Sequence, residues 1–251
     1  MNLVNLLMKK NYKILSLLII LLIPLIVSAK SENANQGYCN RVSNAYQKLI
    51  QRIDNLDEKL EQKRNQIVAR LEERRQQRDT RFTKKREKWD ANREKHFALL
   101  EEKAGTEEQK QALLKFKQIV SQAIIDRRQA VDQAINDFRE GVEDLKLARW
   151  DDIDEMIANY RDELKLAFEN ANNECGKGSD QGDISQSLKN QLRNTKQGFL
   201  DNKATVGNIR EGMQELIEAK KQAIQQAKDD FKETINQALE DLKLVFPEVE
   251  E

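Results

Sequence analysis

The stretch Lys103-Ala104-Gly105-Thr106-Glu107-Glu108-Gln109 decides the fold, because it interrupts a helical pattern that otherwise runs through most of the chain. Glycine is favoured just past the end of a helix. Thr106, with Gln109 three residues later, has the spacing of a capping box, which starts a new helix. The stretch therefore predicts a helix that ends near residue 103, a turn at 104–106 and a second helix from 107.

Apolar residues on both sides of this turn recur at steps of three and four residues, the spacing of one helix face. They include Val42, Leu49, Ile53, Leu56 and Leu60 before the turn and Phe138, Val142, Leu145, Ile153 and Tyr160 after it. The two prolines are Pro24 and Pro247, so residues 25–246 contain none. Most enzyme folds need many turns and are excluded. We predict an all-α protein with long helices over 38–103, 107–175 and 184–246.

The two cysteines suggest how the first two helices are arranged. Cys39 lies 66 residues before Gly105, and Cys175 lies 70 residues after it. If the chain reverses at Gly105, the arms have nearly equal length and the cysteines meet at their base. We therefore predict a Cys39–Cys175 disulfide that closes an antiparallel coiled-coil hairpin over residues 30–175. In that register residue i faces about 214 − i.

Charge is distributed in agreement with this pairing. The chain has 43 basic and 43 acidic residues and a formal net charge of zero. Residues 59–82 hold eight basic and four acidic residues, whereas 132–155, which face them in the predicted register, hold three basic and nine acidic. Opposite charges on facing helices favour the predicted hairpin.

A glycine-rich loop over residues 176–183 separates the second helix from the third. Asp183, with Gln186 three residues later, is the expected N-cap of a helix over 184–246, followed by an acidic tail at 247–251. This helix packs on the hairpin as a three-helix bundle or on another chain of an oligomer. Four glycines stand alone inside the helical pattern. We predict that the helices tolerate them, at a cost in helix stability of roughly 1 kcal/mol each relative to alanine. They are Gly141, Gly198, Gly207 and Gly212.

One helical segment is repeated. Residues 127–140 resemble residues 220–233, with an offset of 93. Both segments begin with two cations followed by Gln-Ala, and both end in Asp-Phe, a cation and Glu. The similarity reflects either an old duplication of a helical segment or convergence on common coiled-coil sequence.

Residues 1–29 have the layout of a secretory signal peptide. Lys9, Lys10 and Lys13 precede an apolar run from Ile14 to Ala29, and no acid occurs in this region. The alternative is an uncleaved segment, residues 12–29, that anchors the protein in the cytoplasmic membrane. Export to the periplasm, the cell surface or the medium also agrees with a disulfide.

Few residues are suited to catalysis or to metal and cofactor binding, and we expect no catalytic, metal or cofactor site. His96 is the single histidine and reads as a seam or flank residue. We predict that a cluster of four acids forms a solvated helix face, because helical carboxylates lack the loop geometry of calcium sites. These acids are Asp151, Asp152, Asp154 and Glu155. No glycine-rich phosphate loop follows a strand.

A basic stretch from Lys63 to Lys95 contains thirteen cations and six acids, with Phe82 and Trp89 between them. Such a stretch is compatible with nucleic acid, but export and the acidic partner arm argue against that partner. An extracytoplasmic polyanion is compatible with the same surface.

Apolar residues also gather near the turn at Gly105, in a greater number than a two-helix seam needs. They are Phe97, Leu99, Leu100, Leu113, Leu114 and Phe116. Either these residues form a tip that binds a client protein or a membrane, or Val245 and Phe246 of the third helix cover them.

The segment from Leu71 to Leu113 carries distinctive phrases at residues 70–75, 88–97 and 107–112, including Lys-Trp-Asp-Ala-Asn-Arg-Glu-Lys-His-Phe. With the signal segment and the two cysteines, they resemble a group of uncharacterised exported bacterial long-helix proteins. This resemblance implies no activity, cofactor or catalytic residue. In layout the chain is also similar to the periplasmic Skp/OmpH chaperones, but it lacks a strand-forming segment and has a third long helix.

These observations favour a non-enzymatic interaction or spacer protein of the cell envelope, with a protein partner there and homo-oligomers as a further possibility. A long coiled coil supplies reach and a repetitive surface rather than a cavity. The alternatives are a holdase chaperone outside the cytoplasm and a peripheral membrane or polyanion binder.

Overall fold

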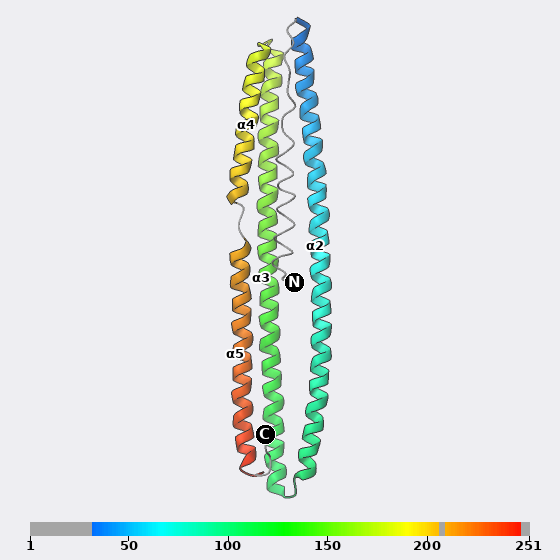
Figure 1. Cartoon of the computed structure of the whole chain (residues 1–251), viewed down its shortest axis with the longest axis vertical. Coiled ribbons are helices and arrows are strands. Elements are labelled where there is room, and N and C mark those ends of the chain that lie inside the picture. Colours follow the sequence, from blue (N-terminus) through cyan, green and yellow to red (C-terminus); the bar gives the residue numbers. More distant parts are fainter. Residues whose placement is uncertain (1–31, 206–208, 247–251) are drawn as a thin grey trace. The chain divides into compact units, whose positions relative to one another are not determined.

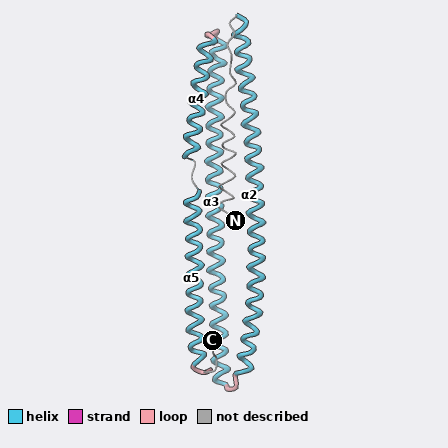
Figure 2. Tube along the Cα trace, in the orientation of Figure 1, coloured by secondary structure: helices cyan, strands magenta, loops and turns pink. Residues whose placement is uncertain are grey.

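The computed structural model describes residues 32–205 and 209–246 and is all-helical over them, as predicted. It contains α2 (Glu32–Lys103), α3 (Glu107–Gly176), α4 (Gln181–Thr205) and α5 (Ile209–Lys243) (Figure 1). Short turns join α2 to α3 and α3 to α4, and these residues include no strand (Figure 2). The predicted signal segment at 1–29 and the acidic tail at 247–251 lie outside the described residues.

The turn between α2 and α3 is closed by the capping box predicted from the sequence. The Gln109 amide N–H donates to Thr106 Oγ1 at 3.2 Å, and the Thr106 N–H donates to Gln109 Oε1 at the same distance. Gln109 Oε1 also accepts the Gly105 N–H at 2.9 Å. One side chain thus satisfies two backbone donors that the start of a helix would otherwise leave without a partner.

The turn between α3 and α4 is shorter than the loop predicted over 176–183, and its cap is Asp180 rather than Asp183. Asp180 Oδ1 accepts the N–H groups of Gly182 at 2.7 Å and of Asp183 at 3.4 Å, so α4 begins at Gln181. Gly178, with φ at 73°, supplies the left-handed residue that reverses the chain. The sequence offered two aspartates with capping potential, and this backbone geometry selects the earlier one.

The helix predicted over 184–246 is described as α4 and α5, with Val206, Gly207 and Asn208 between them outside the described residues. After α5 the chain turns, and the amides of Val245 and Phe246 donate to the Leu242 carbonyl. The helices divide into two compact units. Unit 1 holds the described residues up to Gln62 and Asp144–Met213, and unit 2 holds Lys63–Glu143 and the described residues from Gln214.

Unit 1 has a contiguous apolar core with the predicted disulfide at its edge. Cys39 and Cys175 are bonded, their Cα atoms are 6.0 Å apart, and 136 positions separate them in sequence. Tyr160 packs on Phe199 with 4.9 Å between ring centres, and burial raises the pKa of Tyr160 to about 12. The fully or nearly fully buried members are Tyr38, Val42, Ile53, Met156, Leu164, Ala167, Phe168, Ile184 and Leu188.

In unit 2 the repeated segments of the sequence lie against each other, one from α3 and one from α5. The Arg127 guanidinium lies 4.9 Å from the centre of the Phe231 ring, and Lys220 Nζ lies 3.6 Å from the centre of the Phe138 ring. An offset of 93 relates Arg127 to Lys220 and Phe138 to Phe231. Each repeat therefore presents a cation and a phenylalanine from equivalent positions to the other repeat, in opposite chain directions, and each contact is a cation–π pair.

Candidate interaction surfaces

The apolar residues near Gly105 are largely covered by the end of the chain. Leu113 and Ala104 are buried together with Leu242 and Phe246, and Val245 packs against the same cluster. Phe97 is buried and meets Phe116 edge to face, with 6.3 Å between ring centres. Of the five residues proposed as an interaction tip, which also include Leu100, only Leu114 is exposed, at 51%. These contacts agree with the second of the two expectations, namely that Val245 and Phe246 cover the apolar residues near the turn.

The middle of α2 has an unusually polar environment, since none of residues 72–96 is buried. Phe82 and Trp89, which continue the heptad spacing of the seam, are 43% and 55% exposed. A heptad position therefore did not ensure burial here. In place of an apolar seam, a ladder of ion pairs joins this part of α2 to α3 within unit 2.

The ladder runs in both directions between the helices. Arg86 of α2 donates two hydrogen bonds to Asp132 of α3, at 2.9 and 2.6 Å, and Arg128 of α3 donates two to Asp90 of α2, at 3.0 and 2.6 Å. Arg139 of α3 also donates to Asp79 of α2. The predicted contrast between a basic and an acidic arm holds for composition, but the closest pairs include α3 arginines on α2 aspartates.

The ladder pairs residue i with 218 − i, a shift of four residues from the predicted register. Side chains on a helix lean toward its N-terminus. In two helices of opposite direction, long side chains therefore meet partners of higher number on both helices, whereas the short cysteines bond at the predicted 214. Arginine length explains the difference.

The ladder also shifts the pKa values of two of its members in the direction that favours their charged forms. The hydrogen bond from Arg128 is the main cause that holds the pKa of Asp90 below its usual value, and Arg93 contributes. The hydrogen bond to Asp132 raises the pKa of Arg86. Bidentate arginine–carboxylate pairs are the stronger and more directional kind of ion pair.

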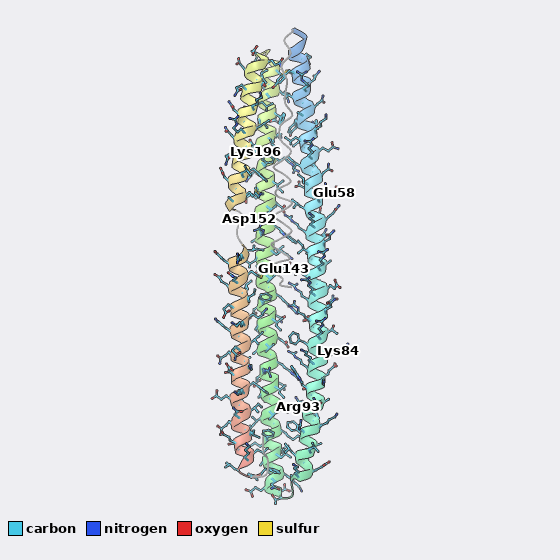
Figure 3. The ribbon with its side chains drawn as sticks, viewed as in Figure 1. Glu58, Lys84, Arg93, Glu143, Asp152 and Lys196 are labelled. Carbon is cyan, nitrogen blue, oxygen red and sulfur yellow. A yellow bond between two sulfur atoms is a disulfide. The ribbon has the colours of Figure 1, made fainter. Side chains whose placement is uncertain are left out.

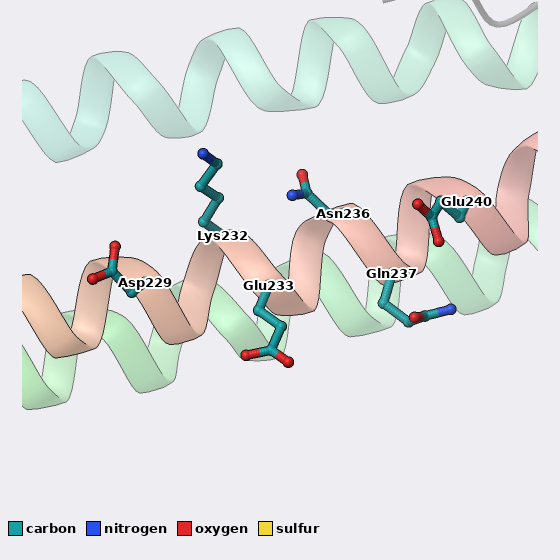
Figure 4. A pocket seen from close by; sticks show the side chains of 6 residues that line it. All are labelled: Asp229, Lys232, Glu233, Asn236, Gln237 and Glu240. Atoms are coloured by element: carbon teal, nitrogen blue, oxygen red, sulfur yellow. The ribbon is translucent and has the colours of Figure 1, made fainter.

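The structure does not bring His96 together with the acidic residues near position 153 to form a catalytic or metal site. His96 is exposed on α2, and Asp151, Asp152, Asp154 and Glu155 are exposed on α3. Among the described residues no three histidines, cysteines or carboxylates gather as a metal ion would require. An open depression lies along α5, where Lys232 points toward α2 and Glu233 away from it (Figure 4). Polar side chains of one helix line it, so it lacks the apolar enclosure of a small-molecule site.

Two glycines proved to have a packing role that the sequence did not reveal. Leu216 occupies the space beside Gly141 in unit 2, and Leu145 occupies the space beside Gly212 in unit 1. A Cβ on Gly212 would lie 2.9 Å from Leu145 Cδ2. Gly198, by contrast, has no atom within 4 Å of such a Cβ and is tolerated as expected. A glycine four residues from a seam leucine, as in Gly141 with Leu145 and Gly212 with Leu216, is the signal that was available.

No protein-family model, curated protein or solved structure matches this chain. No helix within residues 32–205 and 209–246 is both long enough and apolar enough to cross a membrane.

Proposed function

We propose that this chain is an exported, non-enzymatic interaction or spacer protein of the cell envelope. Its first two long helices, α2 and α3, form an antiparallel coiled-coil hairpin closed by the Cys39–Cys175 disulfide. The third helical segment, α4 and α5, packs against this hairpin as a three-helix bundle. The role follows from the surface, because extended helices offer many repeated side chains to a partner and no enclosed site for a substrate.

The disulfide carries the proposal. A bond between residues 136 positions apart persists where thiols are oxidised, as in the periplasm or outside the cell. The signal-like residues 1–29 favour the same compartments, and the uncleaved anchor over residues 12–29 places the helices outside the cytoplasmic membrane as well. Both versions expose the same helical surface to envelope proteins.

Fractionation of the native host, with thiol trapping before lysis, tests this role. We expect the chain in an extracytoplasmic fraction, with the tryptic peptides of Cys39 and Cys175 joined in a nonreducing digest. The N-terminal peptide recovered there distinguishes a chain that starts at Lys30, after cleavage behind Ala29, from one that retains residues 12–29. A cytoplasmic chain with two free thiols would refute export.

A holdase chaperone is the second candidate, and one observation favours it. Leu99 and Leu114 near the turn and Leu244 beyond α5 remain exposed in unit 2 although their neighbours are buried. A holdase suppresses aggregation of an unfolded secreted protein, and Leu99→Ser with Leu114→Ser weakens that effect. Undiminished aggregation at molar excess of this chain eliminates the candidate.

A further inference from the structure

One side of α2 in unit 2 carries a long run of cations, all of them exposed except the half-buried Arg74. Their positions recur at steps of three, four and seven residues, which places them on one side of the helix. We call this set the basic strip, and it consists of Lys63, Arg70, Arg74, Arg81, Lys84, Lys85, Lys88 and Lys95. Three intervening positions on this side, Ile67, Gln77 and Asn92, are uncharged, and one acid, Glu73, lies at its edge and accepts a hydrogen bond from Gln77 at 3.1 Å. At 1.5 Å per residue, the strip extends about 50 Å.

The basic strip faces away from the ladder. Lys84 points outward from α2, whereas Arg93 points toward α3 (Figure 3). The ladder uses Asp79, Arg86 and Asp90, and none of the eight strip cations forms an ion pair with a residue of the described ranges. The acids of α3 that pair with α2 therefore leave this side of the helix with its full positive charge.

Unit 1 carries a run of opposite sign on α3. Exposed acids recur there at three-, four-, seven- and eight-residue steps, again on one side of a helix. We call this set the acidic strip, and it consists of Asp144, Asp151, Asp154, Glu155, Asp162 and Glu169. One cation, Lys165, lies within it and pairs with Glu169 at 3.9 Å. The strip extends about 40 Å.

The acidic strip also contains exposed leucines. Leu147 and Leu166 lie on the same side of α3 as the carboxylates and are 45% and 59% exposed. These leucines add apolar area to a side of α3 that is otherwise charged, and apolar area is what the centre of a contact surface contributes. Leu99, exposed four residues after Lys95, follows the basic strip in the same way.

We propose that the basic strip of one molecule docks on the acidic strip of a second copy of this chain. The two strips have opposite charge and similar length, and one contact explains both of them. An anionic polymer would account for the basic strip alone and would leave the acids and leucines of α3 without a role. The proposal names a partner for the interaction role above and rests on that role in this respect.

The expected contact is weak and depends on salt. An individual exposed ion pair contributes little to association, so the contact requires many of them together. Salt shortens the range of these charges to about 3 Å at 1 M, from about 10 Å at 0.1 M. Complementary strips of this kind determine register and partner choice more than affinity.

The test measures the mass of the purified, oxidised chain by analytical ultracentrifugation over a dilution series at low and at high salt. Two charge-reversed variants are compared with it. One carries Arg81→Glu, Lys84→Glu and Lys88→Glu, and the other carries Asp151→Lys, Glu155→Lys and Asp162→Lys. A matched control for the basic-strip variant carries Lys189→Glu, Lys228→Glu and Lys232→Glu, which are exposed on α4 and α5 and lower the net charge by the same amount as that variant does.

We expect the natural chain to associate at low salt and to be monomeric at about 1 M salt, where screening is strongest. Each strip variant alone is monomeric, because most of the attraction between the strips is lost. The three reversals leave the basic strip with five cations and three acids, or the acidic strip with more cations than acids. An equimolar mixture of the two variants associates again, and the control behaves as the natural chain does. Recovery in the mixture distinguishes docking between the strips from a loss of folding, which mixing would not repair.

A natural chain that is monomeric at every salt concentration overturns the proposal. So does a control that loses association as completely as the strip variants. If the monomeric chain instead binds polyphosphate and the basic-strip variant does not, the strip recognises an anionic polymer and self-docking is wrong. All of these results come from purified protein, so they do not depend on whether the chain is exported in its host.

Discussion

Leu216 of α5 fills the space beside Gly141 of α3, so that its Cδ1 atom would lie 2.9 Å from a Cβ at that position. Two helices come this close only where one of them lacks a side chain. Within unit 2, the contact lies next to the reciprocal cation–π pairs of the repeated segments. Packing of α5 on α3 therefore depends on a residue that, by helix propensity alone, would be a defect.

Gly141→Ala should consequently destabilise unit 2. The new methyl group must displace Leu216, and overpacking typically costs about 1–3 kcal/mol, against a gain of roughly 1 kcal/mol in helix propensity. Gly198→Ala is the matched control, because its Cβ meets open space, and it should raise stability by about 0.5–1 kcal/mol. Thermal unfolding compares the two variants. Equal stabilisation by both would show that Leu216 does not restrict this position.

Loss of the disulfide should destabilise unit 1 selectively. Replacing Cys39 and Cys175 by serine releases a loop of 136 residues, nominally worth about 5 kcal/mol in the chain-entropy model. Trp150 belongs to unit 1 and Trp89 to unit 2. In a Trp89→Phe background, Trp150 fluorescence reports the unfolding of unit 1, and the midpoint of its urea transition should shift to a lower urea concentration. A larger shift of the Trp89 signal, in a Trp150→Phe background, contradicts the assignment.

Acid should weaken the ladder at Asp90. The pKa of Asp90 in the folded chain lies below its ordinary value of 3.8, chiefly because Arg128 donates to it. Such a group contributes stability above its unfolded pKa and loses it as pH falls through the folded value. Asp90→Asn should therefore lower stability near neutral pH and flatten its decline below about pH 4. Glu215→Gln, an exposed carboxylate of α5, is the control, and a steep decline retained in Asp90→Asn would contradict this role.

The cover over the apolar tip should depend on Leu242. This side chain is 2% exposed and packs with Leu113, Ala104 and Phe246. Leu242→Ala should cost about 2–5 kcal/mol through lost burial and the resulting cavity. It should also increase binding of a hydrophobic dye, because Phe97, Leu100 and Phe116 lose their cover. Leu244→Ala, at an exposed neighbour, should change neither measurement, and an equal effect of both variants would refute the cover.

Much of the local structure could be predicted from particular residues. Thr106 and Gln109 satisfy each other's backbone donors, so their spacing was sufficient to locate the start of α3. The cap at Asp180 was missed because two aspartates three residues apart both had capping potential, and only the backbone around Gly178 selects between them. The packing roles of Gly141 and Gly212 were missed, because their four-residue spacing from a seam leucine suggests such a role but does not show how closely two helices approach.

The sequence by itself determined that the described chain is helical, where its main turns fall and which cysteines bond, because these depend on short-range spacing and on a single possible pairing. Tertiary structure decided which of the periodic residues are buried. Phe82 and Trp89 continue the helical spacing of Leu71 but remain exposed, and Leu114 is exposed beside the buried Leu113, because burial requires a neighbouring helix on that side. It also decided that the charges of α2 between residues 63 and 95 separate into a paired ladder and an outward-facing strip, since only the packing of α2 on α3 assigns each cation to a side.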